Sequence, residues 1–276
     1  MARKYWYSLF FLFSFLIKVS GQYPASTFGH HHSYYFNPAM VGIEKKRTIN
    51  LNYNLNEDEK YGLISYEHPS KNLNHNIGCF LKIYSGRYEA VNSIGLAYNY
   101  TFKTSENISI TPGFQFTQFY IGSSRSSVTN SRWEFKPNMD LGLVLAIKKI
   151  RIGVSVFDLW QLIENDDPIV LQSPFEKRSF NGFVSQKIKA HKKLDLTLAF
   201  LYHKRTNNTP TIDLSGHALI SKTFMLGGTL RVEDEPFAKL FLGIRRWEYI
   251  SFQISIDTKK GSDNFRHTEL LLKYDL

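Results

Sequence analysis

The chain has 276 residues, a formal net charge of +10, 43% hydrophobic and 15% aromatic residues, and a single cysteine. A composition so rich in aromatic residues excludes an intrinsically disordered protein. A disulfide scaffold is excluded as well, because Cys79 has no second cysteine in the chain to pair with. After residue 21, no apolar run approaches the about 18 residues that indicate a membrane-spanning helix.

Residues 1–21 are predicted to be a secretory signal peptide. A short basic start precedes the apolar run YWYSLFFLFSFLI, and small residues at 19–21 offer a cleavage site. The run is shorter than the about 20 apolar residues that cross a bilayer, which favours cleavage over the alternative of a retained anchor helix. Cleavage removes Arg3, Lys4 and Lys18 but no acid, so the net charge falls from +10 to +7.

Residues 22–46 are expected to form a lead-in to the fold. The histidine triplet at 30–32 could bind a metal, but neighbouring side chains of an extended chain point to opposite sides. We therefore predict no metal site there. Pro38 fixes its own φ and biases Asn37 away from the helical region, while Gly42 permits a turn, so this stretch predicts a defined entry to the first strand.

From residue 47 to 276 the sequence alternates between apolar and polar residues, which is typical of β-strands. In INLNYNL (49–55), for example, asparagines occupy every second position. The count predicts fourteen strands, with twelve or sixteen as alternatives because boundaries are uncertain by about two to four residues. The predicted strands are 47–55, 61–67, 75–84, 92–102, 108–121, 138–148, 150–158, 179–188, 193–203, 211–221, 223–232, 238–245, 249–257 and 266–276.

An antiparallel sheet of this size must protect its edges, either as a soluble sandwich or barrel or as a membrane barrel. One face of the strands is almost entirely Leu, Ile, Val, Phe and Tyr, whereas the other is dominated by Gly, Ala, Ser, Thr and Asn. A soluble barrel would place charge on its outer face. Strands of about ten residues with aromatic residues near their ends favour a closed antiparallel barrel in the outer membrane.

The connections between strands give an independent test of the strand count. Bacterial barrels have short periplasmic turns and longer outer loops, so with a periplasmic N-terminus the even-numbered connections should be short. They are five residues or fewer, with KK, KAHKK and SKT among them, and only HPSKNLN is longer. The long odd-numbered connections include 122–137 and 159–178, and a miscount of one strand would have inverted this relation.

At YYFNPAMVGIEKKRTINLNYN the chain resembles the N-terminal signature of the PorP/SprF family of type IX secretion system membrane proteins. That signature has an aromatic-Asn-Pro element and an NPA-x-x-G core before the first strand. The middle block PNMDLGLVLAIKKIRIGVSVFDLWQ and the ending HTELLLKYDL also resemble the family, so the resemblance extends from about residue 22 to the end. The residues that carry it are Tyr35, Phe36, Asn37, Pro38, Ala39, Gly42, Asp140, Gly142, Gly153 and Ser155.

The resemblance implies a non-enzymatic outer-membrane barrel without cofactors. It implies a role in type IX secretion or gliding motility. In that role the barrel would support the export or surface retention of a secreted adhesin that carries a C-terminal sorting domain. The expected partners are this cargo, periplasmic components of the secretion machinery and outer-membrane lipid. An outer-membrane channel for small solutes is the alternative, because small and polar inward residues could leave an aqueous lumen.

Two other interpretations of the sequence are weaker. His217 alternates with Asp213 and Ser215 on one face and could serve a hydrolase, but a solvated lumen lining explains the spacing as well. Gly153 and Ser155 lack the surroundings of a nucleophile elbow. The basic residues are spread over short turns without a nucleic-acid motif, so we expect no nucleic-acid partner.

The basic turns instead predict a rim that attracts an acidic periplasmic partner or anionic head groups. If the N-terminus is periplasmic, these turns lie at the periplasmic rim, whereas acidic tips at 57–59 and 233–235 lie outside. The predicted partner contacts are Lys192, Lys193, Arg245 and Arg246.

Overall fold

The computed structural model describes residues 36–55, 60–72, 74–85, 89–123, 133–157, 159, 179–205, 210–232, 236–246, 250–257 and 268–276. Within these ranges the chain forms a 15-stranded sheet and one short 3-10 helix, η1 (Pro38–Met40). The strands are β1 (Thr48–Leu55), β2 (Lys60–Pro69), β3 (His75–Ser85), β4 (Glu89–Tyr100), β5 (Phe102–Lys103), β6 (Ile108–Ser123), β7 (Trp133–Ile147), β8 (Ile150–Phe157), β9 (Ser179–His191), β10 (Leu194–Arg205), β11 (Thr211–Ile220), β12 (Phe224–Val232), β13 (Phe237–Arg246), β14 (Ile250–Asp257) and β15 (Thr268–Asp275).

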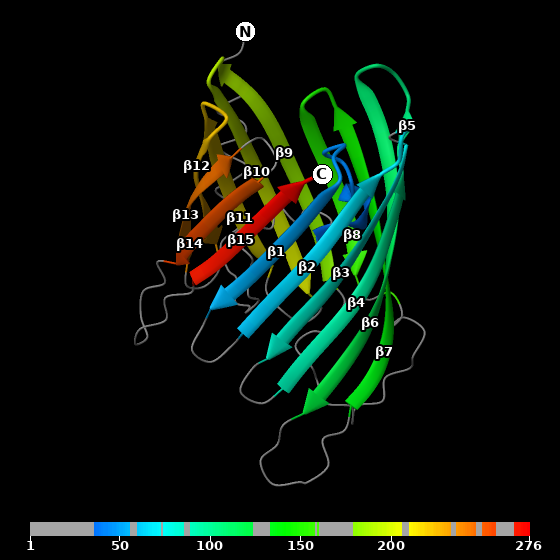
Figure 1. Ribbon diagram of the computed structural model, residues 1–276. Helices are drawn as coiled ribbons and strands as arrows, with labels where there is room; N and C mark the ends of the chain where they lie inside the picture. The colour runs from blue at the N-terminus through cyan, green and yellow to red at the C-terminus, as the bar shows by residue number, and fades with distance from the viewer. Residues whose placement is uncertain are drawn as a thin grey trace.

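The sheet closes on itself as a barrel (Figure 1). All pairings are antiparallel, and β1 pairs with β15 along its whole length, from Thr48 opposite Asp275 to Leu55 opposite Thr268. β4 and β5 are two parts of one strand, because both pair with β6 and only Thr101 lies between them. Counted in this way the barrel has fourteen strands, which confirms the predicted number.

The largest departure from the predicted boundaries is at the start of β7. We predicted a loop from 122 to 137 and a strand from 138. In the structure β7 begins at Trp133, and Pro137 lies opposite Gln118 inside the ladder. A proline removes only its own backbone donor, so the residues on either side of it continue to pair with β6.

Side chains alternate between the lipid face and the lumen as the sequence predicted. On β3, Ile77 and Ile83 are about half exposed on the outside, whereas Asn76 and Phe80 are buried inside. The same division holds on β13, where Leu242 is 60% exposed. In water such a surface would be an aggregation hazard, whereas in a bilayer it contacts acyl chains.

The short turns lie together at one end of the barrel, the upper end in Figure 1. They include 148–149, 192–193 and 221–223. The chain enters β1 at the same end, where the Leu276 amide donates a hydrogen bond of 2.8 Å to the Arg47 carbonyl. We call this the short-turn end. Among the described residues, no helix is long and apolar enough to span a membrane.

The lipid-facing assignment predicts a depth-dependent effect of charge. Leu242→Arg, near the middle of β13, should lower the free energy of unfolding in bilayers by about 2–4 kcal/mol. Phe224→Arg, on an equally exposed residue at the rim end of β12, should cost about 0–1 kcal/mol, because arginine can reach the head groups there. Chemical unfolding in phospholipid vesicles measures both. Equal losses would contradict the assignment.

Candidate functional site

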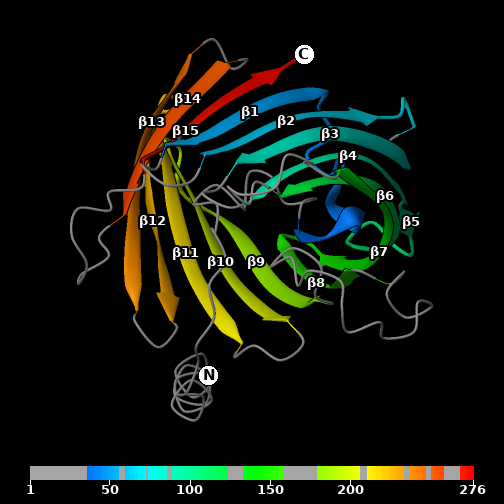
Figure 2. The ribbon, with the colours of Figure 1, turned by 90° about the horizontal axis from the view of Figure 1, so that it is seen from below.

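The lead-in folds back into the lumen and fills part of it. Figure 2 shows η1 inside the ring of strands, beside β6, β7 and β8. We call residues 36–47 the plug. Its contacts run from the middle of β8, at Phe36, to the short-turn end, where Arg47 leads into β1.

The first described residue of the plug is tied to the barrel wall by its backbone. The Ser155 hydroxyl of β8 donates to the Phe36 carbonyl (2.5 Å), and the Asn181 amide of β9 donates to the same oxygen (3.0 Å). Both side chains are buried. Two donors on one carbonyl fix where the chain enters its turn.

Asn37 is fully buried and joins the plug to two strands. Its Oδ1 accepts the Ala39 N–H (2.9 Å) and so caps η1. Its Nδ2 donates to the carbonyls of Leu143 in β7 (3.3 Å) and Val154 in β8 (2.9 Å). Pro38 occupies the first helical position, where a missing N–H is tolerated. The Asn-Pro pair therefore both shapes the turn and anchors it.

Two glycines of the wall let the plug approach this closely. A Cβ at Gly142 of β7 would overlap the Asn37 carboxamide. A Cβ at Gly113 of β6 would stand 2.5 Å from the Ala39 nitrogen. Any side chain at either position would push η1 away from the wall.

Apolar packing and a further amide hold the other side of η1. Ala39, Met40 and Val41 are buried against a cluster of wall residues: Leu63, Phe80, Ala97 and Val144. Burying a valine or methionine side chain contributes about 1.5–3 kcal/mol. The Asn99 amide of β4 donates to the carbonyls of Ala39 (3.1 Å) and Val41 (2.7 Å). These carbonyls lie at the end of η1, where the helix itself offers them no donor.

Beyond η1 the plug turns and forms an ion-pair cluster near the short-turn end. Gly42 adopts φ of 62°, and its amide donates to the Glu67 carboxylate (2.7 Å). Glu44 then pairs with Arg151 (2.9 Å) and Lys187 (2.6 Å). Burial alone would raise the pKa of the Glu44 carboxyl, but the charges of Lys187 and Arg151 outweigh it and hold the pKa well below its usual range.

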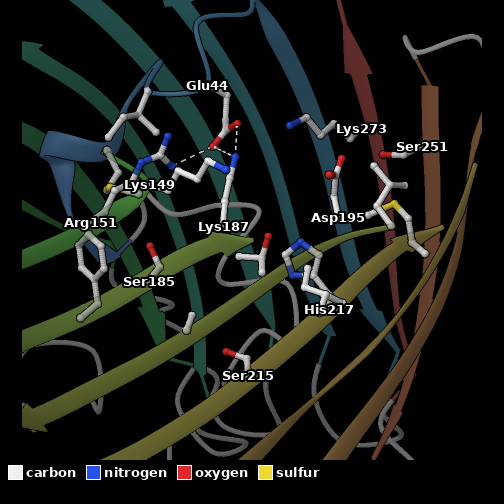
Figure 3. Close-up of a pocket in the computed structure, with 18 of the residues that line it drawn as sticks. Glu44, Lys149, Arg151, Ser185, Lys187, Asp195, Ser215, His217, Ser251 and Lys273 are labelled. Carbon is white, nitrogen blue, oxygen red and sulfur yellow. Dashed lines mark hydrogen bonds and ion pairs between the residues drawn. The ribbon is translucent and has the colours of Figure 1, made fainter. Parts of the chain in front are cut away.

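A cavity of about 640 Å³ occupies the part of the lumen that the plug leaves free. Figure 3 shows Lys149, Arg151 and Lys187 beside Glu44 on one side of it, and Ser215 and His217 on another. Lys273 and Ser251 line the opposite wall.

Closer to the long loops, buried polar contacts join neighbouring strands along the lumen wall. The Asp140 carboxylate of β7 accepts the amides of Gln115 (2.8 Å) and Asn138 (2.9 Å). Across the lumen, Arg231 binds both oxygens of Asp213, each at 2.6 Å, and the Arg231 side chain is only 6% exposed. Such pairs hold neighbouring strands in register.

The structure brings most of the family-motif residues to one place. Phe36, Asn37, Pro38 and Ala39 form the first part of the plug, and Gly142 and Ser155 belong to the wall that it touches. The other three have separate positions: Gly42 makes the turn, Asp140 joins the buried polar contacts, and Gly153 lies opposite Phe183 of β9. Tyr35 lies outside the described residues, as do the histidine triplet, the predicted signal peptide and both acidic tips.

The four basic residues predicted as partner contacts all reach the short-turn end, but not on one surface. Lys192 and Lys193 are exposed in the turn between β9 and β10, and Arg246 is exposed at the end of β13. Arg245 instead turns into the lumen, where its Nη2 lies 3.5 Å from the Asp275 carboxylate. Alternation along β13 explains this, since Arg245 shares a face with the buried Phe241.

The serine and histidine grouping does not assemble a triad. Ser215 and His217 share the lumen wall, but the Asp213 carboxylate is bound by Arg231. Among the described residues, no group of His, Cys, Asp and Glu could hold a metal ion. Sequence reasoning missed Glu44, Asn99 and Gly113, whose partners lie far away in the sequence. The one available signal was that Asn99 and Gly113 lie on predicted strands, whereas Glu44 lies in the predicted lead-in.

A family profile described as "Type IX secretion system membrane protein PorP/SprF" matches residues 20–274. The chain belongs to the PorP/SprF family. It is therefore an outer-membrane component of the type IX secretion system, and its family is one of membrane barrels rather than enzymes. No curated protein matches the chain.

Solved structures with a similar fold are outer-membrane proteins. Omp33 of Acinetobacter baumannii has a TM-score of 0.54 at 6% identity, over 84% of this chain and 98% of that one. The CymD monoaromatic hydrocarbon channel has a TM-score of 0.53 at 9% identity, over 93% of this chain and 94% of that one. At such identities the likeness shows the fold alone, a closed outer-membrane barrel.

The contacts of Asn37 predict that its loss frees the plug. In a Cys79→Ser background, Met40→Cys places a thiol on a residue that is 5% exposed. Adding Asn37→Ala should raise the rate of maleimide labelling at least about tenfold, because a lost cap costs about 1 kcal/mol and each lost buried hydrogen bond about as much again. Asn107→Ala, in an exposed short turn, should leave the rate unchanged. Equal rates in the two variants would show that Asn37 does not hold the plug.

Proposed function

We propose that this barrel supports the export or surface retention of a secreted adhesin through protein contacts, and does not conduct solutes. The barrel anchors the assembly in the outer membrane, the long connections face the adhesin, and the short turns face the periplasmic machinery. The observation that carries this proposal is the plug. A lumen partly filled by the protein's own chain, which packs against the wall, favours a rigid scaffold over a passage for solutes.

Charge at the short-turn end supports a periplasmic protein partner. Among the described residues of this end, cations far outnumber carboxylates, so the surface carries a strong positive potential. A field of this kind speeds association with an acidic partner and fixes its orientation. The cations are Lys45, Lys46, Arg47, Lys71, Lys103, Lys148, Lys149, Arg151, Lys187, Lys189, Lys192, Lys193, Lys222, Arg245, Arg246 and Lys273, and the carboxylates are Glu44, Glu67, Glu106, Asp195 and Asp275.

The second candidate is a channel for small solutes. The cavity of about 640 Å³ and the likeness to channel-forming barrels favour it. A channel needs a continuous water path, and reconstitution in a planar bilayer separates the two functions. A steady open conductance in the wild-type protein would support the channel and contradict a packed lumen.

The test of the proposed function is affinity purification from the native outer membrane, with the co-purified proteins identified. Components of the secretion machinery and an adhesin should be recovered with the wild-type barrel. Charge reversal at Lys192, Lys193, Arg245 and Arg246 should lower the recovery of periplasmic components several-fold, because it inverts part of the basic field. Reversal of the same number of charges on the long connections is the matched control. Unchanged recovery in the rim variant would contradict a role for this end.

A further inference from the structure

The lumenal cavity opens at the basic end of the barrel and ends inside it. Lys149, Lys189 and Arg245 line it where the strands end at the short turns. Its inner end is lined by Asp213, whose carboxylate is already held by the buried Arg231. The cavity is therefore a pocket that faces the short-turn end, with a volume in the usual range of ligand sites, about 300–1,000 Å³.

Positive charge at the pocket mouth exceeds the negative charge available to neutralise it. Arg151 and Lys187 share one carboxylate, that of Glu44. On the far wall, Asp275 is approached by three cations: Lys46 at 3.3 Å, Arg245 at 3.5 Å and Lys273 at 3.7 Å.

Two further cations of the mouth, Lys149 and Lys189, form no ion pair within 4 Å in the described part of the chain, and Asp195 of β10, opposite Lys189, is the nearest carboxylate along the ladder. The excess is spread around the mouth instead of being concentrated at one point. A single small anion would neutralise only part of it, so the pocket fits a ligand with several negative charges.

Between the cations, the pocket wall carries apolar and hydroxyl groups. Met40 of the plug and Phe183 supply apolar surface, and Leu219 and Met225 add to it beside the short turn at 221–223. Hydroxyl groups between them can bind the amides and carbonyls of a peptide: Ser185, Thr197, Ser215 and Thr229. A ligand that uses both regions needs acidic groups and apolar side chains on one short chain.

From this arrangement we infer that the pocket binds an acidic and apolar peptide segment of a periplasmic partner, inserted beside the plug. The inference rests on the proposed function, which places the short-turn end in the periplasm and gives it protein partners. Carboxylates of the segment pair with the mouth cations, and its apolar side chains lie against Met40, Phe183 and Met225. The plug forms one wall, so the segment also contacts the part of the chain that the family signature specifies.

The test uses the full-length mature barrel in lipid nanodiscs and labelled synthetic peptides as probes. A short peptide of alternating glutamate and leucine should bind at least about tenfold more tightly than a glutamate–serine or a lysine–leucine peptide of equal length, a difference of about 1.4 kcal/mol. Binding should weaken as salt is raised, because the mouth charges are partly exposed. Fluorescence anisotropy measures each affinity.

Two matched pairs of variants locate the binding. Lys149→Glu with Lys189→Glu should weaken binding at least about tenfold, whereas Lys71→Glu with Lys103→Glu should weaken it less than about threefold. Both pairs change the net charge equally at the short-turn end, but only the first lines the pocket. Ser215→Trp should abolish binding by filling the pocket, whereas Leu214→Trp, on the opposite face of β11, should not.

Several outcomes would overturn the inference. Equal losses in the two charge pairs would mean a general attraction to the basic end, and equal binding of the glutamate–serine peptide would mean that the apolar wall is not used. Full binding by a folded Ser215→Trp barrel would place the peptide elsewhere. If the wild-type barrel binds no peptide yet still recovers periplasmic components from native membranes, the pocket assignment fails and the proposed function stands.

Discussion

A bilayer offers no water to the backbone, so every N–H and C=O group within it must be paired inside the protein. The fold meets this constraint by joining β1 to β15, which leaves the barrel without a free edge. The consequence for the side chains is equally strict. Alternation sends the large apolar residues to the lipid, and the small and polar residues that remain face the lumen.

The plug fills part of the lumen that this arrangement creates. Asn37, Asn99 and Ser155 are polar groups inside a membrane barrel, and each is satisfied by the backbone of the plug or the wall. Gly113 and Gly142 have no side chain, and this leaves the space that the plug occupies. The residues of the family signature therefore form a turn that packs against particular strands of the wall. What the plug does not fill becomes the pocket at the basic end.

The sequence predicted the strands well, because a period of two is visible residue by residue and the loop lengths tested the count independently. It also predicted the turn at Asn37 and Pro38, whose backbone preferences are local. It could not predict that Asn37 reaches Leu143 and Val154, more than a hundred residues away. Pairings such as Glu44 with Lys187 depend on how the closed barrel places distant strands side by side. The sequence placed the start of β7 five residues too late, at 138 instead of Trp133, because pairing with β6 continues through Pro137.

The central claim is that the plug lies inside the barrel in the membrane, and a disulfide measures this most directly. A Cβ at Gly78 of β3 would stand 2.9 Å from a Val41 methyl, so cysteines at these two positions are within bridging reach once the valine branch is removed. In a Cys79→Ser background, Val41→Cys with Gly78→Cys should cross-link within one chain in native outer membranes. Val41→Cys with Ser251→Cys should not, because β2, β1 and β15 separate β14 from β3. A cross-link with Ser251→Cys but none with Gly78→Cys would contradict the account.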